Sequence, residues 1–315
     1  MKPLKMKPLE FDLLDVSDFH RATRNLLQET KFMDDYLSKR NERYDIIEKP
    51  DIFCDNLRSV KQEYTRFDLF CRNKNANILV CPFPMEIMEF IGKGEHIRSA
   101  IEEICSYHKN KLVIFNWNHD NDSSLYFSNI SVNNYRIINY GYTKQKIKNS
   151  ITVPFFNYNT KPYREQKQFF CSFIGTINNQ LRYKLIKNIE QTKSFTYINN
   201  KKEEDYLKIM SSSIFSLCPR GGPNDGGFSY RFFECMHLNT IPVIISDHLI
   251  FPYPDLDWKR ICLHFPEHIL DDLALLEEKL KTIDIEGHMK YIHENKNRFT
   301  LGGVQEEVYK GLLGA

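Results

Sequence analysis

One stretch of the sequence decides the fold: Ser213-Ile-Phe-Ser-Leu-Cys-Pro-Arg-Gly-Gly-Pro-Asn-Asp-Gly-Gly-Phe-Ser-Tyr-Arg-Phe-Phe-Glu234, followed closely by Ile241-Pro-Val-Ile-Ile245. Its pattern predicts a strand, a glycine-rich loop, a short helix and a second strand. Four of the chain's thirteen glycines lie within residues 221–227, where they leave backbone amides open to a ligand. Ser229 is the expected N-cap, so the loop leads to the positive end of a helix, where an anion binds.

Charged side chains around this loop extend the predicted anion site. Arg220 precedes the loop and Arg231 follows it, and we expect both to converge on a diphosphate through charge-assisted hydrogen bonds. Glu234 shares a helix face with Arg231 and suits the hydroxyls of a ribose. The sequence therefore indicates a nucleotide site. Spacing alone leaves an alternative open, a surface ion pair between Arg231 and Glu234 worth ~0.3–0.5 kcal/mol.

Outward from this stretch, short apolar runs alternate with amphipathic segments, which is typical of an α/β protein with largely parallel sheets. The predicted helices cover residues 95–108, 180–191 and 203–210. The predicted strands cover residues 77–81, 111–115, 135–139, 169–174, 214–217 and 241–245.

A polar linker divides the chain into two α/β domains. Residues 158–168 contain Pro162 and show no apolar period, as expected of a domain boundary. We place an N-terminal domain at 1–160, a C-terminal domain at 161–286 and a helical tail at 287–315, packed across the domains.

Composition excludes several classes of protein. The 43 Lys and Arg residues nearly balance 41 Asp and Glu residues, for a net charge of +2, so nucleic acid is not an expected partner. No run reaches the roughly 18 apolar residues of a membrane span, and no signal-peptide pattern opens the chain, so we expect a cytoplasmic protein. The eight cysteines show no metal-binding spacing, which predicts reduced thiols and no metal.

The motifs resemble those of the exostosin-like glycosyltransferases. That family has a C-terminal pattern of S-x-F-x-L-x-P-x-G, a variable loop, S-x-R-x-x-E, a helix, G-x-I-P-V-I-I-x-D and a later D-W pair. Asn239 replaces the usual glycine, and asparagine also tolerates the left-handed conformation of a helix end. The counterparts in this sequence are Ser213, Phe215, Leu217, Pro219, Gly221, Ser229, Arg231, Glu234, residues 241–245, Asp247, Asp257 and Trp258.

The resemblance continues more weakly upstream. Phe173-Ile-Gly175 followed by Arg182 is similar to a strand, glycine and helix of the family. Residues 116–120 resemble its acceptor-side region, with His and Asp in reversed order. His119 and Asp120 are therefore the candidates for the catalytic base, since they follow the strand at 111–115. A solvated polar turn is the alternative for these residues.

The resemblance implies a GT-B fold, with two Rossmann-like domains facing across a cleft. It also implies an inverting transfer of sugar from a UDP-sugar to an oligosaccharide or glycan acceptor, as in polysaccharide biosynthesis. Because arginines can stabilise the departing diphosphate, we expect no metal and no other cofactor. The implied donor-binding residues are Arg220, Gly221, Gly226, Gly227, Ser229, Tyr230, Arg231, Glu234, Arg182 and Gly175.

Two other functions stay open. A fucosyltransferase-like enzyme that uses a GDP-sugar would share the two-domain plan and an arginine-rich diphosphate site. A catalytically silent subunit that binds glycan or nucleotide is the second, because the sequence at 118–120 departs from the family pattern.

Overall fold

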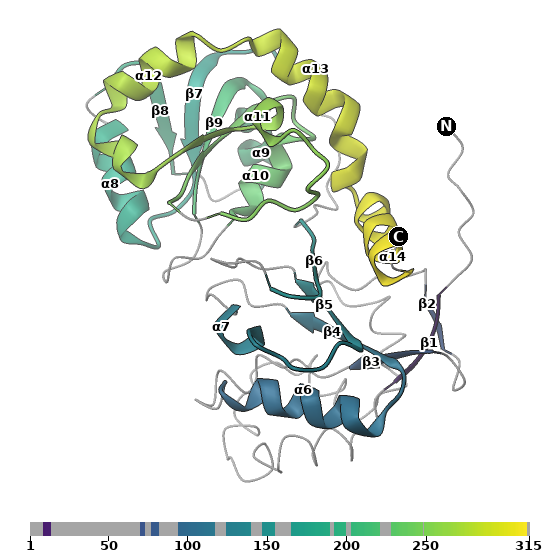
Figure 1. Ribbon diagram of the computed structural model, residues 1–315. Coiled ribbons are helices and arrows are strands. Elements are labelled where there is room, and N and C mark those ends of the chain that lie inside the picture. The colour runs from purple at the N-terminus through teal and green to yellow at the C-terminus, as the bar shows by residue number, and fades with distance from the viewer. Residues whose placement is uncertain are drawn as a thin grey trace.

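A computed structural model provides the structure of the protein. It describes residues 9–13, 70–72, 77–81, 94–116, 124–139, 147–154, 165–189, 192–199, 203–220, 228–247 and 249–313. The described chain forms two bodies, each built on one parallel β-sheet flanked by helices (Figure 1). The predicted α/β class is therefore confirmed.

The first sheet has six parallel strands in the order β2-β1-β3-β4-β5-β6. Its strand β1 comes from the N-terminal region, where the sequence pattern predicted no element, and it pairs with both β2 and β3. The strands are β1 (Leu9–Leu13), β2 (Phe70–Arg72), β3 (Ile78–Cys81), β4 (Lys111–Asn116), β5 (Tyr135–Asn139) and β6 (Ser150–Thr152).

Both faces of the first sheet are covered. Helix α6 (His96–Tyr107) turns Ile97 and Ile101 toward one face, where they join a core that includes Leu112 of β4. Because successive strand residues point to opposite faces, Val113 belongs to a different core. The short helix α7 (Ser124–Phe127) lies beside α6. The sequence of a strand that is buried on both faces is continuously apolar, and residues 112–115 of β4 show this pattern.

The second sheet has five parallel strands in the order β11-β10-β9-β7-β8. Strand β10 is buried along its whole length, which explains its unbroken apolar sequence. The strands are β7 (Phe169–Ile174), β8 (Phe195–Ile198), β9 (Ser213–Pro219), β10 (Ile241–Ile245) and β11 (Leu263–Phe265).

Helices lie on both sides of the second sheet (Figure 1). On one side, α8 (Gln180–Ile189) contacts β8 and the 3-10 turn η1 (Glu267–Asp271), which α12 (Leu273–Lys281) also contacts. On the other side lie α9 (Glu203–Ser211), α10 (Tyr230–Cys235), α11 (Trp258–Ile261) and α13 (Ile285–Asn295).

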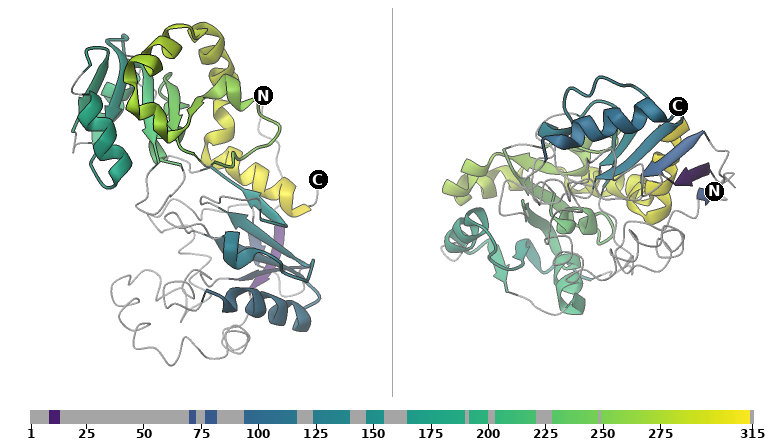
Figure 2. Two further views of the ribbon diagram at one scale, coloured as in Figure 1. Left: turned by 60° about the vertical axis from the view of Figure 1, so that its left-hand side comes forward. Right: turned by 90° about the horizontal axis from the view of Figure 1, so that it is seen from below.

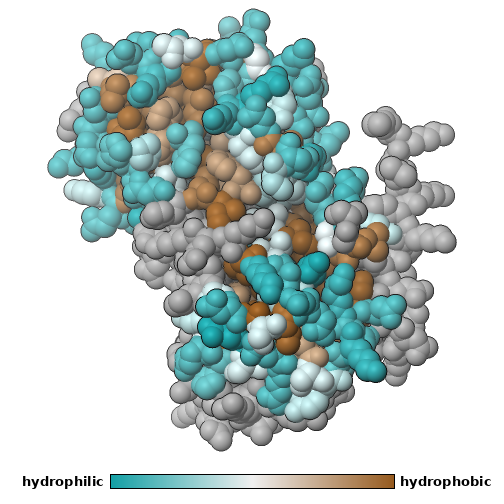
Figure 3. All heavy atoms as spheres, viewed as in Figure 1, coloured by the Kyte–Doolittle hydropathy of each residue, from teal (hydrophilic) through white to brown (hydrophobic). Residues whose placement is uncertain are grey.

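The C-terminal segment returns to the first sheet. After α13, the turn η2 (Lys296–Phe299) leads into α14 (Leu301–Leu313), which lies beside the first sheet in two views (Figures 1 and 2). Lys111 Nζ donates to the carbonyl oxygen of Leu312 at 2.9 Å. Val308 of α14 and Val113 of β4 belong to the same core. In the space-filling view, hydrophobic residues of the described surface show on both sides of the junction between the bodies (Figure 3).

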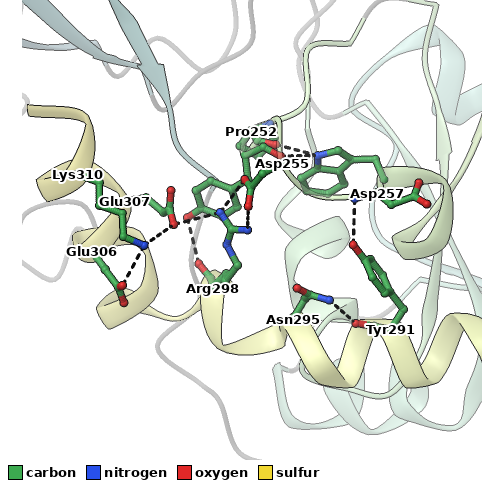
Figure 4. A network of polar contacts seen from close by, with 11 residues as sticks. Pro252, Asp255, Asp257, Tyr291, Asn295, Arg298, Glu306, Glu307 and Lys310 are labelled. Atoms are coloured by element: carbon green, nitrogen blue, oxygen red, sulfur yellow. Dashed lines mark hydrogen bonds and ion pairs between the residues drawn. The ribbon is translucent and has the colours of Figure 1, made fainter. Parts of the chain in front are cut away.

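An ion-pair network holds the turn between α13 and α14 (Figure 4). Arg298 binds the Asp255 carboxylate through both terminal nitrogens, at 2.5 and 3.0 Å, and Glu307 of α14 at 3.1 Å. Its guanidinium carbon also lies 4.5 Å from the centre of the Tyr253 ring. The network therefore ties α14 to the second body.

The predicted strands and helices are confirmed, with ends that differ by one or two residues. The strands β2, β8 and β11 and the short helices α7 and α11 were not among the predicted elements. Each has three or four residues, too few to show a period in the sequence. Helix α12, with nine residues, was also not predicted.

Candidate functional site

The candidate site lies at the carboxyl edge of the second sheet. Gly175 follows β7, Arg220 follows β9 and Ser246 follows β10. Because these strands are parallel, their carboxyl ends meet at one edge, and ligands of open α/β sheets bind there.

Ser229 begins α10 as predicted. Its side-chain oxygen accepts a hydrogen bond from the backbone amide of Arg231, and its backbone is extended, as an N-cap requires. After α10, a turn over residues 236–239 leads to β10 and ends at Asn239, which has a positive φ of 53°. This confirms the expected left-handed conformation of Asn239. Ser229 thus fixes where α10 begins, directly after the glycine-rich loop.

Arg231 turns inward from α10. Its side chain is only 6% exposed. Nη1 donates to Ser229 Oγ at 3.2 Å, and Nη2 donates to the carbonyl oxygen of Ile174 at the end of β7. The guanidinium carbon lies 4.9 Å from the centre of the Phe173 ring. This buried position differs from the surface ion pair with Glu234 that the spacing left open.

Arg182 approaches the same strand end from α8. It is 7% exposed, its Nη1 donates to the carbonyl oxygen of Thr176 at 3.4 Å, and its guanidinium carbon lies 5.9 Å from the Phe173 ring centre. Asn179 accepts from the backbone amide of Arg182 at 2.9 Å and so begins α8. Phe173 is therefore shared by two buried arginines.

The two arginines form a buried pair of like charges. Burial and, second to it, the positive charge of Arg231 together lower the pKa of Arg182 to about 10. Within the described part of the chain, neither guanidinium forms an ion pair. The Nε atoms of both are buried and have no hydrogen-bond partner. Buried, unpaired donors of like charge are costly, and a bound anion would satisfy both.

Gly175 makes room for Arg231. A Cβ atom at this position would lie 2.6 Å from Arg231 Nη2. Since real Cβ atoms do not approach other atoms so closely, only glycine allows the guanidinium to reach Ile174 in this position. Tyr197 also donates to the carbonyl oxygen of Gly175, at 3.2 Å.

Arg220 has a carboxylate partner within the protein. Its Nε donates to Glu267 Oε1 at 2.6 Å, and the backbone amide of Glu267 donates to Asp247 Oδ1 at 2.8 Å. The side chains of Arg220 and Glu267 are 12% and 24% exposed. Glu267 therefore partly neutralises the charge of Arg220.

Glu234 lies one helical turn after Arg231 and accepts a hydrogen bond from the hydroxyl of Tyr206. The Tyr206 ring centre is also 5.8 Å from the guanidinium carbon of Arg231. A carboxylate, two guanidinium groups and a tyrosine are thus brought together from α8, α9 and α10.

Several predicted site residues lie outside the described residues: Gly221, Gly226, Gly227, His119 and Asp120. Tyr230 is the first residue of α10. Asp255 and Asp257 have other partners: Asp255 binds Arg298, and Asp257 caps α11 by accepting from the amide of Lys259.

Sequence reasoning missed Phe173, Tyr206 and Glu267 as parts of this site. Phe173 lies in a motif of apolar residues that reads as core. Tyr206 and Glu267 meet their partners across 28 and 47 residues of sequence. No local pattern marks such contacts, because they depend on how α9 and η1 pack.

The described residues contain neither a group of metal-ligating side chains nor a membrane-spanning helix. No three histidine, cysteine, aspartate or glutamate side chains in those ranges are grouped so that they could hold a metal ion. No helix in the same ranges is both long enough and apolar enough to span a bilayer.

The fold is α/β, with two parallel sheets and two buried arginines at the carboxyl edge of the second sheet. The family model of the exostosin GT47 domain matches residues 95–280, which is more than half of the chain. The chain therefore belongs to the exostosin GT47 family of glycosyltransferases. The expected GT-B class agrees with the two parallel-sheet bodies.

Curated relatives share parts of the chain. A probable glucuronosyltransferase of Oryza sativa subsp. japonica is 30% identical over 130 residues, which are 37% of this chain and 29% of the relative. Exostosin-1 of Drosophila melanogaster is 33% identical over 67 residues, 21% of this chain and 8% of the relative. The matched segments thus span less than a third of either relative.

Solved structures show a distant likeness. A glycosyltransferase from Rickettsia africae covers 98% of this chain and 99% of its own, with 10% identity and a TM-score of 0.45. An alpha1,3-fucosyltransferase with GDP covers 99% of this chain and 92% of its own, with 11% identity and a TM-score of 0.40.

Proposed function

We propose that this protein transfers a sugar from a UDP-sugar to an oligosaccharide or glycan acceptor, with inversion at the anomeric carbon. The observation that supports the proposal is the pair Arg182 and Arg231. Both are buried at the carboxyl edge of the second sheet, and both have an Nε atom without a partner.

The pair suits the diphosphate of a sugar nucleotide. Each charge-assisted hydrogen bond to a phosphate oxygen contributes about 1.5–3 kcal/mol, and a diphosphate offers several acceptor oxygens to two guanidinium groups. Negative charge grows on the diphosphate as the glycosidic bond breaks. Arg182 and Arg231 would stabilise that charge, with Arg220 as a third, partly neutralised cation.

Arginines at the diphosphate make a divalent metal unnecessary in this proposal. The remaining donor contacts are assigned to the backbone of residues 221–227 for the phosphates and to Glu234 for the ribose hydroxyls. Asp120 or His119 would serve as the base that removes the proton of the acceptor hydroxyl.

A donor screen that measures released nucleoside diphosphate tests the proposal. The panel contains UDP-glucose, UDP-N-acetylglucosamine, UDP-galactose and UDP-glucuronic acid, the last because the curated relatives are named as glucuronosyltransferases. GDP-fucose and a preparation treated with EDTA are the comparison arms. We expect UDP release that EDTA does not reduce.

Arg231→Ala is the diagnostic variant. We expect it to lower kcat/KM by at least ~30-fold, the equivalent of about 2 kcal/mol. Arg260→Ala is the matched control, because Arg260 is exposed on α11 and lies over Tyr291, far from this edge. Equal activity of Arg231→Ala and wild type would contradict the proposal. Turnover of GDP-fucose alone would assign the alternative donor, and no turnover with UDP retained in the site would indicate a silent subunit.

A further inference from the structure

Tyr206 connects two helices on one side of the second sheet. It lies on α9, and its hydroxyl donates to Glu234 Oε2 on α10. The side chain is largely buried, and α9 packs against β7 and β9 while α10 packs against β9 and β10. The contact therefore joins residues whose helices are fixed independently on the sheet.

The same tyrosine contacts Arg231, with 5.8 Å between its ring centre and the guanidinium carbon. Residues three apart on a helix, as Arg231 and Glu234 are, face each other and readily pair. Here the Arg231 nitrogens donate to Ser229 Oγ and Ile174 O, whereas Glu234 accepts from Tyr206. Tyr206 thus helps to hold the two charged groups on separate partners.

Tyr206 remains a donor across the whole working range of pH. Burial raises the pKa of its hydroxyl well above the ordinary value, Arg231 opposes this, and the charge of Glu234 adds to it. A protonated tyrosine can give its hydrogen to a carboxylate, which has about four acceptor positions in all. Accepting from Tyr206 therefore leaves Glu234 able to accept from a ligand as well.

We propose that Tyr206 is a positioning residue that orients the Glu234 carboxylate to accept both ribose hydroxyls of the sugar nucleotide. This inference rests on the proposed function, because it requires a nucleoside diphosphate at the arginine pair. It does not depend on which base the nucleotide carries. Tyr206 itself touches no substrate.

The consequence is a selection for ribose. A site built to hydrogen-bond hydroxyl groups discriminates strongly against an analogue that lacks them, because its own polar group is left unpaired. If the Tyr206 hydroxyl is removed, the carboxylate keeps its charge but loses its fixed orientation. Affinity for the ribose should then fall, whereas affinity for a ligand without ribose hydroxyls should not.

The experiment is calorimetric titration of the full chain with UDP and with 2′,3′-dideoxyuridine diphosphate. We expect wild type to prefer UDP by about 10-fold or more, and Tyr206→Phe to reduce that preference about 3- to 10-fold, the range of one hydrogen bond. Affinity for the dideoxy analogue should stay within about 2-fold of wild type. With a sugar nucleotide, KM should rise in Tyr206→Phe while kcat is kept.

A double-mutant cycle separates positioning from packing. In a Glu234→Ala background, Tyr206→Phe should not change the preference any further, because its effect passes through Glu234. Tyr291→Phe is the matched control: the Tyr291 hydroxyl accepts from the amide of Asp257, away from the arginine pair. It should behave as wild type.

Each outcome has a distinct meaning. An unchanged UDP preference in Tyr206→Phe, or an equal loss of both ligands, overturns the positioning role and leaves the donor site intact. An effect of Tyr206→Phe that persists in the Glu234→Ala background also overturns it. If wild type binds neither UDP nor GDP, the proposed function fails and this inference fails with it. If only GDP binds, GDP and its dideoxy analogue replace the uridine pair.

Discussion

Gly175 and Arg231 lie so close that a Cβ atom on residue 175 would stand 2.6 Å from Arg231 Nη2. The glycine follows the last residue of β7, and the arginine reaches it from α10 to donate to Ile174. The absence of a side chain at Gly175 thus decides where the buried charge of Arg231 lies, at the carboxyl edge of the second sheet.

Gly175→Ala should displace the Arg231 guanidinium and weaken donor binding about 10-fold, the effect of losing roughly one charge-assisted hydrogen bond. Titration with UDP measures the effect. Gly302→Ala is a matched control, because a Cβ at Gly302 meets nothing within 4 Å. That variant should bind UDP normally and, as a helical glycine replaced by alanine, gain up to about 1 kcal/mol of stability. Equal UDP affinity in both variants would show that the position of Arg231 is not important for binding.

Arg182→Met should raise the melting temperature of the ligand-free protein while it weakens UDP binding by at least about 10-fold. Removing one of two buried like charges relieves repulsion and desolvation in the empty site, whereas the diphosphate loses a charge-assisted partner. Thermal unfolding with and without UDP measures both effects. A variant that loses stability and keeps its UDP-induced shift would count against an anion site here.

Arg298→Ala should destabilise the protein by about 1–2 kcal/mol. The change removes a bidentate ion pair with Asp255, an ion pair with Glu307 and the packing of the guanidinium on the Tyr253 ring. Because Asp255 is 66% exposed, the ion pair between Asp255 and Arg298 contributes only a small part of this destabilisation, and that part is sensitive to salt. Chemical denaturation at low and high salt is the measurement. Lys310→Ala removes ion pairs with Glu306 and Glu307 in which the lysine is 51% exposed, and it keeps every contact of Arg298. It should change stability by no more than about 0.5 kcal/mol.

His237 should make the protein less stable in acid. Burial lowers the pKa of this imidazole, and Lys296 lowers it further, whereas a hydrogen bond from the ring to Phe299 O opposes the shift. Below the ordinary histidine pKa the unfolded chain therefore binds more protons than the folded chain, so stability falls as the pH falls.

His237→Gln should lose less stability than wild type between pH 7 and pH 5, as followed by denaturant unfolding. His293→Gln is the control, since His293 is exposed on α13. If wild type and His237→Gln show parallel losses over this range, the buried imidazole is not responsible.

The sequence predicted the local architecture of the site well. The run from Ser213 to Ile245 predicted strand, loop, helix and strand. Ser229 begins the short helix as its side chain requires, and Asn239 takes the left-handed conformation in the turn that follows the helix. These features depend on neighbouring residues: an N-cap bonds two residues away, and the strand period is read within one element.

The sequence did not predict the partners of the charged side chains inside the protein. The sequence led us to expect that Arg220 and Arg231 converge on a diphosphate, because both flank the glycine loop, and this stays a prediction. The structure brings Arg182 to Arg231, Glu267 to Arg220 and Tyr206 to Glu234. Two side chains that are near each other along the chain need not share a partner, because each turns toward whichever element packs beside it.

By itself, then, the sequence determined the α/β class, the parallel strands and the N-cap of the helix that follows the glycine loop. All of these arise from apolar period and from hydrogen bonds within a few residues. Only the tertiary structure decided that two guanidinium groups share Phe173 and that Tyr206 donates to the Glu234 carboxylate. Those contacts form because parallel strand pairing carries the ends of β7 and β9, and the helices around them, to a single edge of the sheet.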